Sequence, residues 1–192
     1  GVQTFALPIY INMARAADWI QRVNETRPPD ERLLLAVLTL KATALAARKY
    51  PAFNGSYTPQ TGFSPNKSIH VGTAIAIRGG GLVSPAIHDC DTMDLNSLMS
   101  HLRDLVARAR VGRLRSSEIS DATITVSSLG DRGADSLFGI IYPPQVALVG
   151  FGRTVRKPVA IGDEVKVQPV MAATLAADHR VSEDRKSTRL NS

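Results

Sequence analysis

The 192-residue chain lacks the features that several classes of protein require. It has one cysteine, Cys90, so neither an intramolecular disulfide nor a cysteine-based metal cluster can form within it. No stretch approaches the roughly 18 consecutive apolar residues that would span a bilayer. The N-terminus has neither the basic start nor the apolar run of a signal peptide. We therefore expect a protein of a reducing compartment with no part in a membrane, and we interpret Cys90 as a small buried side chain.

Metal and nucleic-acid sites have no support in the sequence either. The four histidines, His70, His88, His101 and His179, form no His-x-x-x-His or His-Glu pair, so the spacing of a zinc site is missing. The formal net charge is +6, but three of the basic residues lie in the last eight positions with no acidic residue among them. The other basic residues alternate with apolar and acidic ones, as on a solvated surface. We expect neither a metal nor a nucleic-acid partner.

The composition is that of a compact globular domain, with 44% hydrophobic and 21% charged residues. Apolar residues at steps of three and four predict three amphipathic helices. The first covers residues 12–24, and the second ends before Pro51 and can be capped by Asp30. The third covers residues 94–110, with Gly112 placed to end it.

Alternating apolar residues at 122–128 and β-rich apolar runs elsewhere predict several strands. They lie at residues 69–75, 82–87, 122–128, 146–151 and 164–177. Residues 79–81 are all glycine and predict the turn of a hairpin; a phosphate-binding loop is disfavoured because no Gly-Lys-Ser/Thr follows. Residues 53–66, rich in glycine and proline, predict a loop. The order of elements favours an α+β fold, a two-layer sandwich of helices on a mixed, mostly antiparallel sheet.

The two ends of the chain differ from this pattern. Residues 1–10 and 185–192 follow neither the strand period nor the helix period. Both resemble translated sequencing-adapter read-through, and we interpret them as non-native ends. The folded domain then spans residues 11–184.

His179 stands apart from the other three histidines, for which we expect structural roles. It follows the apolar run 171–177, and its neighbours are Asp178 and Arg180, with Glu183 close behind. An imidazole of ordinary pKa near 6.5 exchanges protons at neutral pH, and a neighbouring carboxylate can orient it. The tripeptide Asp-His-Arg is by itself more often structural than catalytic.

Four segments of the chain carry a family resemblance. They are HVGTAIAIRGGGLVSPAI at residues 70–87, TITVSSLG at 123–130, IIYPPQVALVGFG at 140–152 and TLAADHRVSED at 174–184. The first two resemble a strand pair ending in Gly-Leu-Val-Val-Pro and a Thr-Phe-Thr-Ile-Ser-Asn-Leu-Gly strand. The last two resemble an Ile-Ile-Asn-Pro-Pro-Gln segment and an Asp-His-Arg-x-x-Asp-Gly motif. All four motifs belong to one family. That family is the dihydrolipoamide acyltransferases, the acyltransferase subunits of 2-oxo-acid dehydrogenase complexes. Residues 11–184 are similar to its catalytic domain.

The resemblance implies a fold like that of chloramphenicol acetyltransferase, a homotrimer or larger cage, and an active site between subunits. His179 matches the catalytic histidine. Ser127, which lies 179 − 127 = 52 positions earlier, matches the serine that binds the oxyanion. These two side chains should therefore meet from different chains. Glu183 matches the position of the carboxylate that supports the active-site loop.

The resemblance also implies substrates and partners. Coenzyme A is a substrate, the lipoyl group comes from a separate domain, and no metal is needed. The dehydrogenase and dihydrolipoamide dehydrogenase subunits of the complex are expected partners. The compartment is the cytoplasm, or the mitochondrial matrix in a eukaryote. The sequence does not select among acetyl, succinyl and branched-chain acyl groups.

Several positions depart from the family pattern. The family has Asp, Gly and Asn where this chain has Glu183, Asp184 and Tyr142. We also expect a fragment that lacks the family's N-terminal strand and closing helix. Two other functions stay open: a catalytically impaired scaffold core, and a related acyltransferase with another acceptor.

Overall fold

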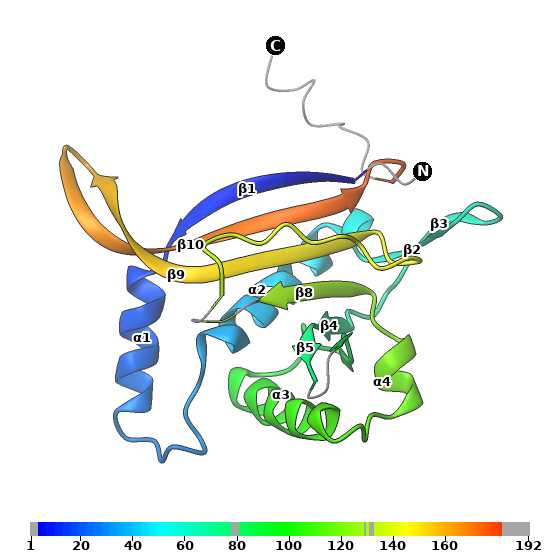
Figure 1. The fold of residues 1–192 in the computed structure, drawn as a ribbon, viewed down its shortest axis with the longest axis horizontal. Helices are drawn as coiled ribbons and strands as arrows, with labels where there is room; N and C mark the ends of the chain where they lie inside the picture. The colour runs from blue at the N-terminus through cyan, green and yellow to red at the C-terminus, as the bar shows by residue number, and fades with distance from the viewer. Residues whose placement is uncertain (1–3, 78–80, 129, 131–132, 182–192) are drawn as a thin grey trace, which may run out of the picture.

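The computed structural model describes residues 4–77, 81–128, 130 and 133–181, with side chains from residue 8 onward. A six-stranded sheet runs through it in the order β1-β10-β9-β8-β4-β7 (Figure 1). The strands are β1 (Thr4–Asn12), β4 (Val71–Thr73), β7 (Ala86–Ile87), β8 (Ile124–Ser128), β9 (Ala147–Ile161) and β10 (Glu164–Asp178). β8 is parallel to both of its neighbours, and the other three pairs are antiparallel. The predicted mixed, mostly antiparallel sheet is confirmed.

Two short hairpins accompany the sheet. β5 (Ile75–Ala76) pairs with β6 (Leu82–Val83), which confirms the predicted hairpin, although Gly79 and Gly80 of its turn lie outside the described residues. β2 (Gly55–Thr58) pairs with β3 (Gly62–Pro65), so the prediction of a loop over residues 53–66 is wrong. The two strands are only four residues long, too short to show an alternating pattern among glycines and prolines.

Three helices correspond to the predicted ones: α1 (Ala14–Asn24), α2 (Leu35–Lys49) and α3 (Leu95–Arg110). The carboxylate of Asp94 caps α3 by accepting from the N–H groups of Asn96 and Ser97. Gly112 follows the helix with φ of 70°, as predicted. Two short elements were not predicted, the 3-10 turn η1 (Pro51–Phe53) and helix α4 (Ser116–Ser120).

The start of α2 differs from the prediction. Its N-cap residue is Leu34, which provides no capping side chain, so the predicted cap by Asp30 is wrong. The loop before α2 is closed by Asn24 instead. The side chain of Asn24 accepts from the Leu33 N–H at 2.8 Å and donates to the Leu33 carbonyl at 2.9 Å. This pair satisfies the backbone of Leu33 and so fixes where the helix can begin.

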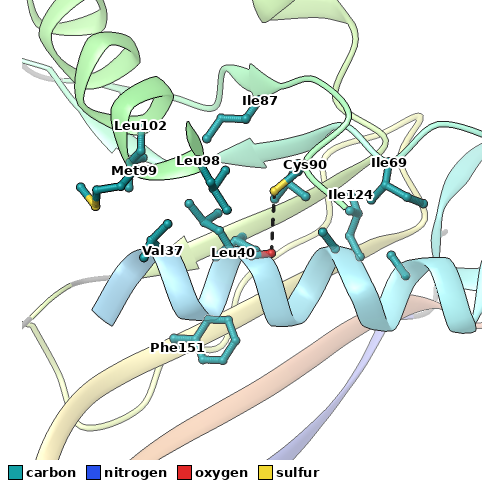
Figure 2. Close-up of a cluster of buried hydrophobic side chains, with 14 of the residues drawn as sticks. Val37, Leu40, Ile69, Ile87, Cys90, Leu98, Met99, Leu102, Ile124 and Phe151 are labelled. Carbon is teal, nitrogen blue, oxygen red and sulfur yellow. Dashed lines mark hydrogen bonds between the residues drawn. The ribbon is translucent and has the colours of Figure 1, made fainter. Parts of the chain in front are cut away.

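The hydrophobic core lies between α2, α3 and one face of the sheet (Figure 2). Val37 of α2, Leu98 of α3 and Phe151 of β9 are among its buried members. Cys90 is fully buried there, with its thiol 4.0 Å from the Leu40 carbonyl. This confirms the interpretation of Cys90 as a small buried side chain. Burial raises the pKa of the thiol to about 12.

An N-terminal strand is present, which corrects two expectations. β1 pairs along its whole length with residues 170–178 of β10, although we expected residues 1–10 to follow no strand pattern and the chain to lack this strand. Its apolar residues do not alternate with polar ones: Ile9 and Tyr10 are adjacent, and both are exposed. The interpretation of residues 1–10 and 185–192 as non-native ends stays a prediction.

β9 is far longer than the predicted strand at residues 146–151. Residues 156–161 of β9 and 164–169 of β10 pair with each other alone and form a two-stranded ribbon that extends beyond the sheet (Figure 1). The basic residues and Pro158 interrupt the alternation of apolar and polar residues in this part of β9, so the sequence pattern did not predict the extension. The ribbon leaves Val165 74% and Val167 55% exposed.

Candidate active site

His179 lies on a tight turn at the end of β10. The Asp178 N–H donates to the Val146 carbonyl at 2.8 Å, and this bond holds the last residue of β10 beside the start of β9. The Val181 N–H donates to the Asp178 carbonyl at 3.0 Å and closes the turn. His179 is exposed at this turn. The predicted strand therefore ends next to His179 and places it at the end of the sheet.

Asp178 and Arg180 form an ion pair on either side of His179. The guanidinium of Arg180 donates to both carboxylate oxygens of Asp178, at 3.0 Å from Nε to Oδ1 and 2.6 Å from Nη2 to Oδ2. The Arg180 N–H also donates to Oδ1 at 3.0 Å. These bonds lower the pKa of Asp178 and keep its carboxylate charged although the side chain is only 3% exposed. The two residues on either side of His179 are thus joined by an ion pair, which holds the backbone of the turn.

Ser127 lies near the end of β8 and is half-buried. Ile124 and Val126 of the same strand belong to the core beneath α2. Because side chains alternate along a strand, Thr125 and Ser127 lie on the opposite face of the sheet. We call this the outer face. It is the face that the helices do not cover.

Ser127 and His179 do not meet within one chain. Ser127 pairs with Gly150 on β9, and Gly150 pairs with Thr174 on β10. His179 follows Thr174 by five residues, in the direction away from Ser127. With strands about 4.8 Å apart and about 3.3 Å per residue along each strand, the two Cα atoms are roughly 19 Å apart. The expectation that the two side chains meet from different chains stays a prediction.

Two glycines of the segment 140–152 let the preceding chain cross the outer face of β9. A Cβ on Gly150 would lie 2.6 Å from the Leu137 carbonyl oxygen, and one on Gly152 would lie 2.0 Å from the Asp135 carbonyl oxygen. Neither position accepts a side chain without a backbone shift. The hydroxyl of Thr174 donates to the Leu137 carbonyl and fastens the crossing segment to β10.

A cavity of about 680 Å³ lies where β8 begins. Its polar lining includes Ser56, Asn66, His70, Ser84, Thr123 and Gln145. The amide oxygen of Gln145 accepts from the Thr125 hydroxyl at 2.7 Å, which places the cavity along the outer face of β8. Ser127 is the next residue of β8 on this face. The hydroxyl of Ser84 is buried and has no hydrogen-bond partner among the described residues. The cavity thus offers polar groups to a ligand at the start of β8.

Three of the histidines are bonded within the fold. The Asp89 N–H donates to Nδ1 of His70 at 3.0 Å, so a neutral His70 carries its proton on Nε2. Burial, and then the neighbouring His88, lower the pKa of His70. Nε2 of His88 is 3.0 Å from a carboxylate oxygen of Asp121. Nδ1 of His101 is 2.8 Å from the Ser97 carbonyl within α3.

The group of His70, His88 and Asp121 at the cavity was not predicted. The two rings lie 4.7 Å apart between centroids, edge to face. Their positions in the sequence are separated by 18 and 33 residues and form no motif. The pairing of β4 with β7, in register with the predicted hairpin, brings the two histidines together, and Asp121 joins them from a distant part of the chain that no sequence pattern signals.

Other predicted features lie outside what the structure describes. Glu183 and Asp184 fall in residues 182–192, beyond the described part of the chain. Among the described residues, no three His, Cys, Asp or Glu side chains are grouped so that they could hold a metal ion. The helices found in the described ranges are all too short or too polar to cross a membrane.

Comparison with known proteins identifies the family. The family described as 2-oxoacid dehydrogenases acyltransferase (catalytic domain) matches residues 2–191. The dihydrolipoyllysine-residue acetyltransferase component of the pyruvate dehydrogenase complex of Staphylococcus epidermidis is 33% identical over 150 residues, which are 78% of this chain and 34% of that protein. The chain thus spans about a third of the length of this relative.

Solved structures agree with the sequence match. The dihydrolipoamide acetyltransferase of Azotobacter vinelandii superposes with a TM-score of 0.89 at 25% identity, over 98% of this chain and 78% of that chain. The cubic core of a pyruvate dehydrogenase multienzyme complex gives the same values. Chloramphenicol acetyltransferase, with a TM-score of 0.64 at 14% identity over 96% of this chain and 83% of its own, shares the fold. The predicted chloramphenicol acetyltransferase-like fold is confirmed, and the chain belongs to the 2-oxoacid dehydrogenase acyltransferase family as a catalytic domain.

Proposed function

We propose that this domain transfers an acyl group between dihydrolipoamide and coenzyme A, with His179 as general base and Ser127 as the donor to the oxyanion. One observation carries the assignment. In the Azotobacter enzyme, a serine and a histidine studied for their role in catalysis are separated by the same number of residues as Ser127 and His179. An asparagine studied with them stands four positions after that histidine, where this chain has Glu183.

The two side chains are suited to the two difficult parts of the reaction. A thiol of ordinary pKa near 8.5 is only a few per cent thiolate at neutral pH, so His179 would accept the proton of the coenzyme A thiol as its sulfur attacks the acyl carbonyl. The carbonyl oxygen becomes negative, and the Ser127 hydroxyl donates a hydrogen bond to it. The carbon–sulfur bond to dihydrolipoamide then breaks, and the protonated imidazole returns its proton to the departing sulfur. No acyl-enzyme forms, because both substrates supply the sulfur.

Two copies of the chain would complete the site. The roughly 19 Å between Ser127 and His179 in one chain excludes a direct partnership there, whereas a second copy can bring its His179 turn to the Ser127 end of the first. The ribbon formed by residues 156–161 and 164–169 leaves Val165 and Val167 exposed, the kind of apolar surface that subunits bury. We propose a homotrimer that assembles into a larger cage, as in the cubic core to which this chain is similar.

The proposal extends to the rest of the complex. The lipoyl group would reach the site from a separate domain, and the dehydrogenase and dihydrolipoamide dehydrogenase subunits would bind the assembled core. The cytoplasm is the proposed compartment. The cavity of about 680 Å³ at the start of β8 is the proposed place for a part of the substrate that extends away from the reacting carbonyl.

The first test is His179→Ala in the full-length gene product, assayed for acyl transfer from acyl coenzyme A to dihydrolipoamide. A general base contributes about 10²–10⁴-fold, so turnover should fall by that factor. His101→Ala is the matched control, since His101 is an exposed histidine on α3 and should leave turnover unchanged. Unchanged turnover in His179→Ala would refute the assignment. A related acyltransferase with another acceptor would show turnover that does not depend on dihydrolipoamide.

A scaffold without activity is the second candidate, because Glu183 and Asp184 depart from the family's Asp and Gly. Glu183→Asp with Asp184→Gly distinguishes the two. Activity that appears or rises in this double variant supports the acyltransferase. Particles that assemble and stay inactive support the scaffold.

A further inference from the structure

Arg180 is held on two sides. Along its edge, the guanidinium bonds both oxygens of the Asp178 carboxylate. Across its face, the Cζ atom lies 3.9 Å from the centroid of the Tyr57 ring. A guanidinium stacked over an aromatic ring at this distance is attracted by the negative face of the ring. The side chain that flanks His179 therefore has a partner outside its own strand.

Tyr57 is fixed by its own contacts. It lies in β2 and is half-buried, and its cross-strand neighbour is Phe63 of β3. The Tyr57 N–H donates to the Pro144 carbonyl at 2.8 Å. Ser56 beside it forms a bridge with Gln145. The hairpin β2–β3 lies at the same end of the molecule as the C-terminal end of β10 (Figure 1).

These contacts form a closed circuit around the turn. The Tyr57 N–H bonds the Pro144 carbonyl, and two residues further along the chain the Val146 carbonyl accepts from the Asp178 N–H. The Asp178 carboxylate accepts from Arg180, whose guanidinium stacks on the Tyr57 ring and closes the circuit. His179 lies within it and is exposed. Asp178 is held by β9, whereas Arg180 is 38% exposed and depends on its two side-chain contacts for a single orientation.

We propose that Tyr57 is a positioning residue for His179, which acts by holding Arg180 against Asp178. This inference rests on the proposed function. Tyr57 lies outside all four segments that resemble the family, 122 positions before His179. Without the ring, the guanidinium gains freedom, the Asp178 carboxylate loses its fixed partner, and the turn samples more conformations. A base that is misplaced by about 1 Å can lose up to about 10²-fold in rate, while binding of the substrates is unaffected.

The test compares Tyr57→Leu with Tyr57→Phe in the full-length gene product. Tyr57→Leu should lower kcat about 10-fold with KM unchanged, whereas Tyr57→Phe keeps an aromatic face and should stay within about twofold of the parent. Tyr10→Leu is the matched control, because its ring lies 4.6 Å from Lys157 and Tyr10 pairs with Ala172, six residues before Asp178 along β10. Should Tyr57→Leu not assemble, Tyr57→Met removes the ring while keeping side-chain volume and carries the same prediction.

A second measurement separates positioning from a general loss of structure. Arg180→Lys keeps the charge but loses the planar, bidentate group that stacks on the ring. In the Arg180→Lys background, Tyr57→Leu should have little further effect on kcat, because the ring acts through the guanidinium. Fully multiplicative losses would overturn the inference, as would a parental kcat in Tyr57→Leu.

His179→Ala, assayed in parallel, separates the role of Tyr57 from the proposed function. If His179→Ala is inactive while Tyr57→Leu is unaffected, the proposed function stands and the role of Tyr57 is refuted. If His179→Ala keeps full activity, the proposed function itself fails.

Discussion

Glu118→Gln should destabilise the domain by about 3 kcal/mol at pH 7. The carboxylate of Glu118 anchors α4 to the end of α3. It accepts from both terminal nitrogens of Arg108, at 2.7 and 2.6 Å, and from the Arg115 N–H at 2.8 Å. The pair is sheltered, with 9% of the Glu118 side chain and 24% of the Arg108 side chain exposed. Residues just after Glu118, Ile119 to Asp121, line the cavity, so this anchor also shapes the candidate site.

The magnitude follows from the pKa of Glu118. Hydrogen bonds from Arg108 lower this pKa from 4.5 to about 2. At about 1.4 kcal/mol per pKa unit, the ionised pair stabilises the fold by about 3 kcal/mol. The folded state binds the proton less tightly than the unfolded state does. The stabilisation is therefore complete well above about pH 4.5 and is lost as the pH falls through that value toward about pH 2.

The assay is urea denaturation of the parent and of Glu118→Gln, at pH 7 and at pH 3. The difference in unfolding free energy should shrink from about 3 kcal/mol at pH 7 to about 1 kcal/mol at pH 3. Asp104→Asn is the matched control. Asp104 bonds the same Arg108 at 2.8 Å but is 64% exposed, so its loss should amount to less than about 1 kcal/mol. A Glu118→Gln effect that is equal at both pH values, or no larger than the Asp104→Asn effect, would refute the reasoning.

Three further predictions concern Gly150, the turn that carries His179, and the buried Cys90. Gly150→Ala should lower the unfolding free energy by about 1–3 kcal/mol, measured by urea titration, because the added Cβ would lie 2.6 Å from the Leu137 carbonyl; an unchanged midpoint contradicts this. Asp178→Asn removes the charge that holds Arg180 and should lower kcat about 10-fold or more in steady-state assays while the chain still folds; a parental kcat contradicts it. Cys90 should resist alkylation by iodoacetamide at pH 8 until urea unfolds the chain, because burial raises its thiol pKa to about 12; rapid labelling of the folded protein would contradict its burial.

Local sequence signals predicted the regular elements well. Asp94 and Gly112 marked the two ends of α3, since a carboxylate cap and a left-handed glycine act within a few residues. The apolar run before His179 predicted a strand that ends at the histidine, because a continuous apolar run typical of a buried strand is also a local signal. Asp30 failed as a cap because a pair between Asn24 and Leu33, nine residues apart, set the start of α2 instead.

Features that depend on distant partners could not be predicted. β1 is a strand because β10 supplies its hydrogen bonds, and its own residues show no alternation. The contact of Tyr57 with Arg180 joins residues more than a hundred positions apart. Ser127 and His179 came from a family resemblance, and the register of three strands then showed that one chain does not unite them.

The central claim is that one chain gives the histidine and another gives the serine of each active site. Subunits carrying His179→Ala and subunits carrying Ser127→Ala should each be nearly inactive alone. When the two are co-expressed in equal amounts and assemble at random into trimers, an interface joins an intact serine to an intact histidine in about one case of four. Co-expression should therefore restore about a quarter of the parental acyl-transfer activity. Activity no greater than the average of the two separate variants would contradict the account.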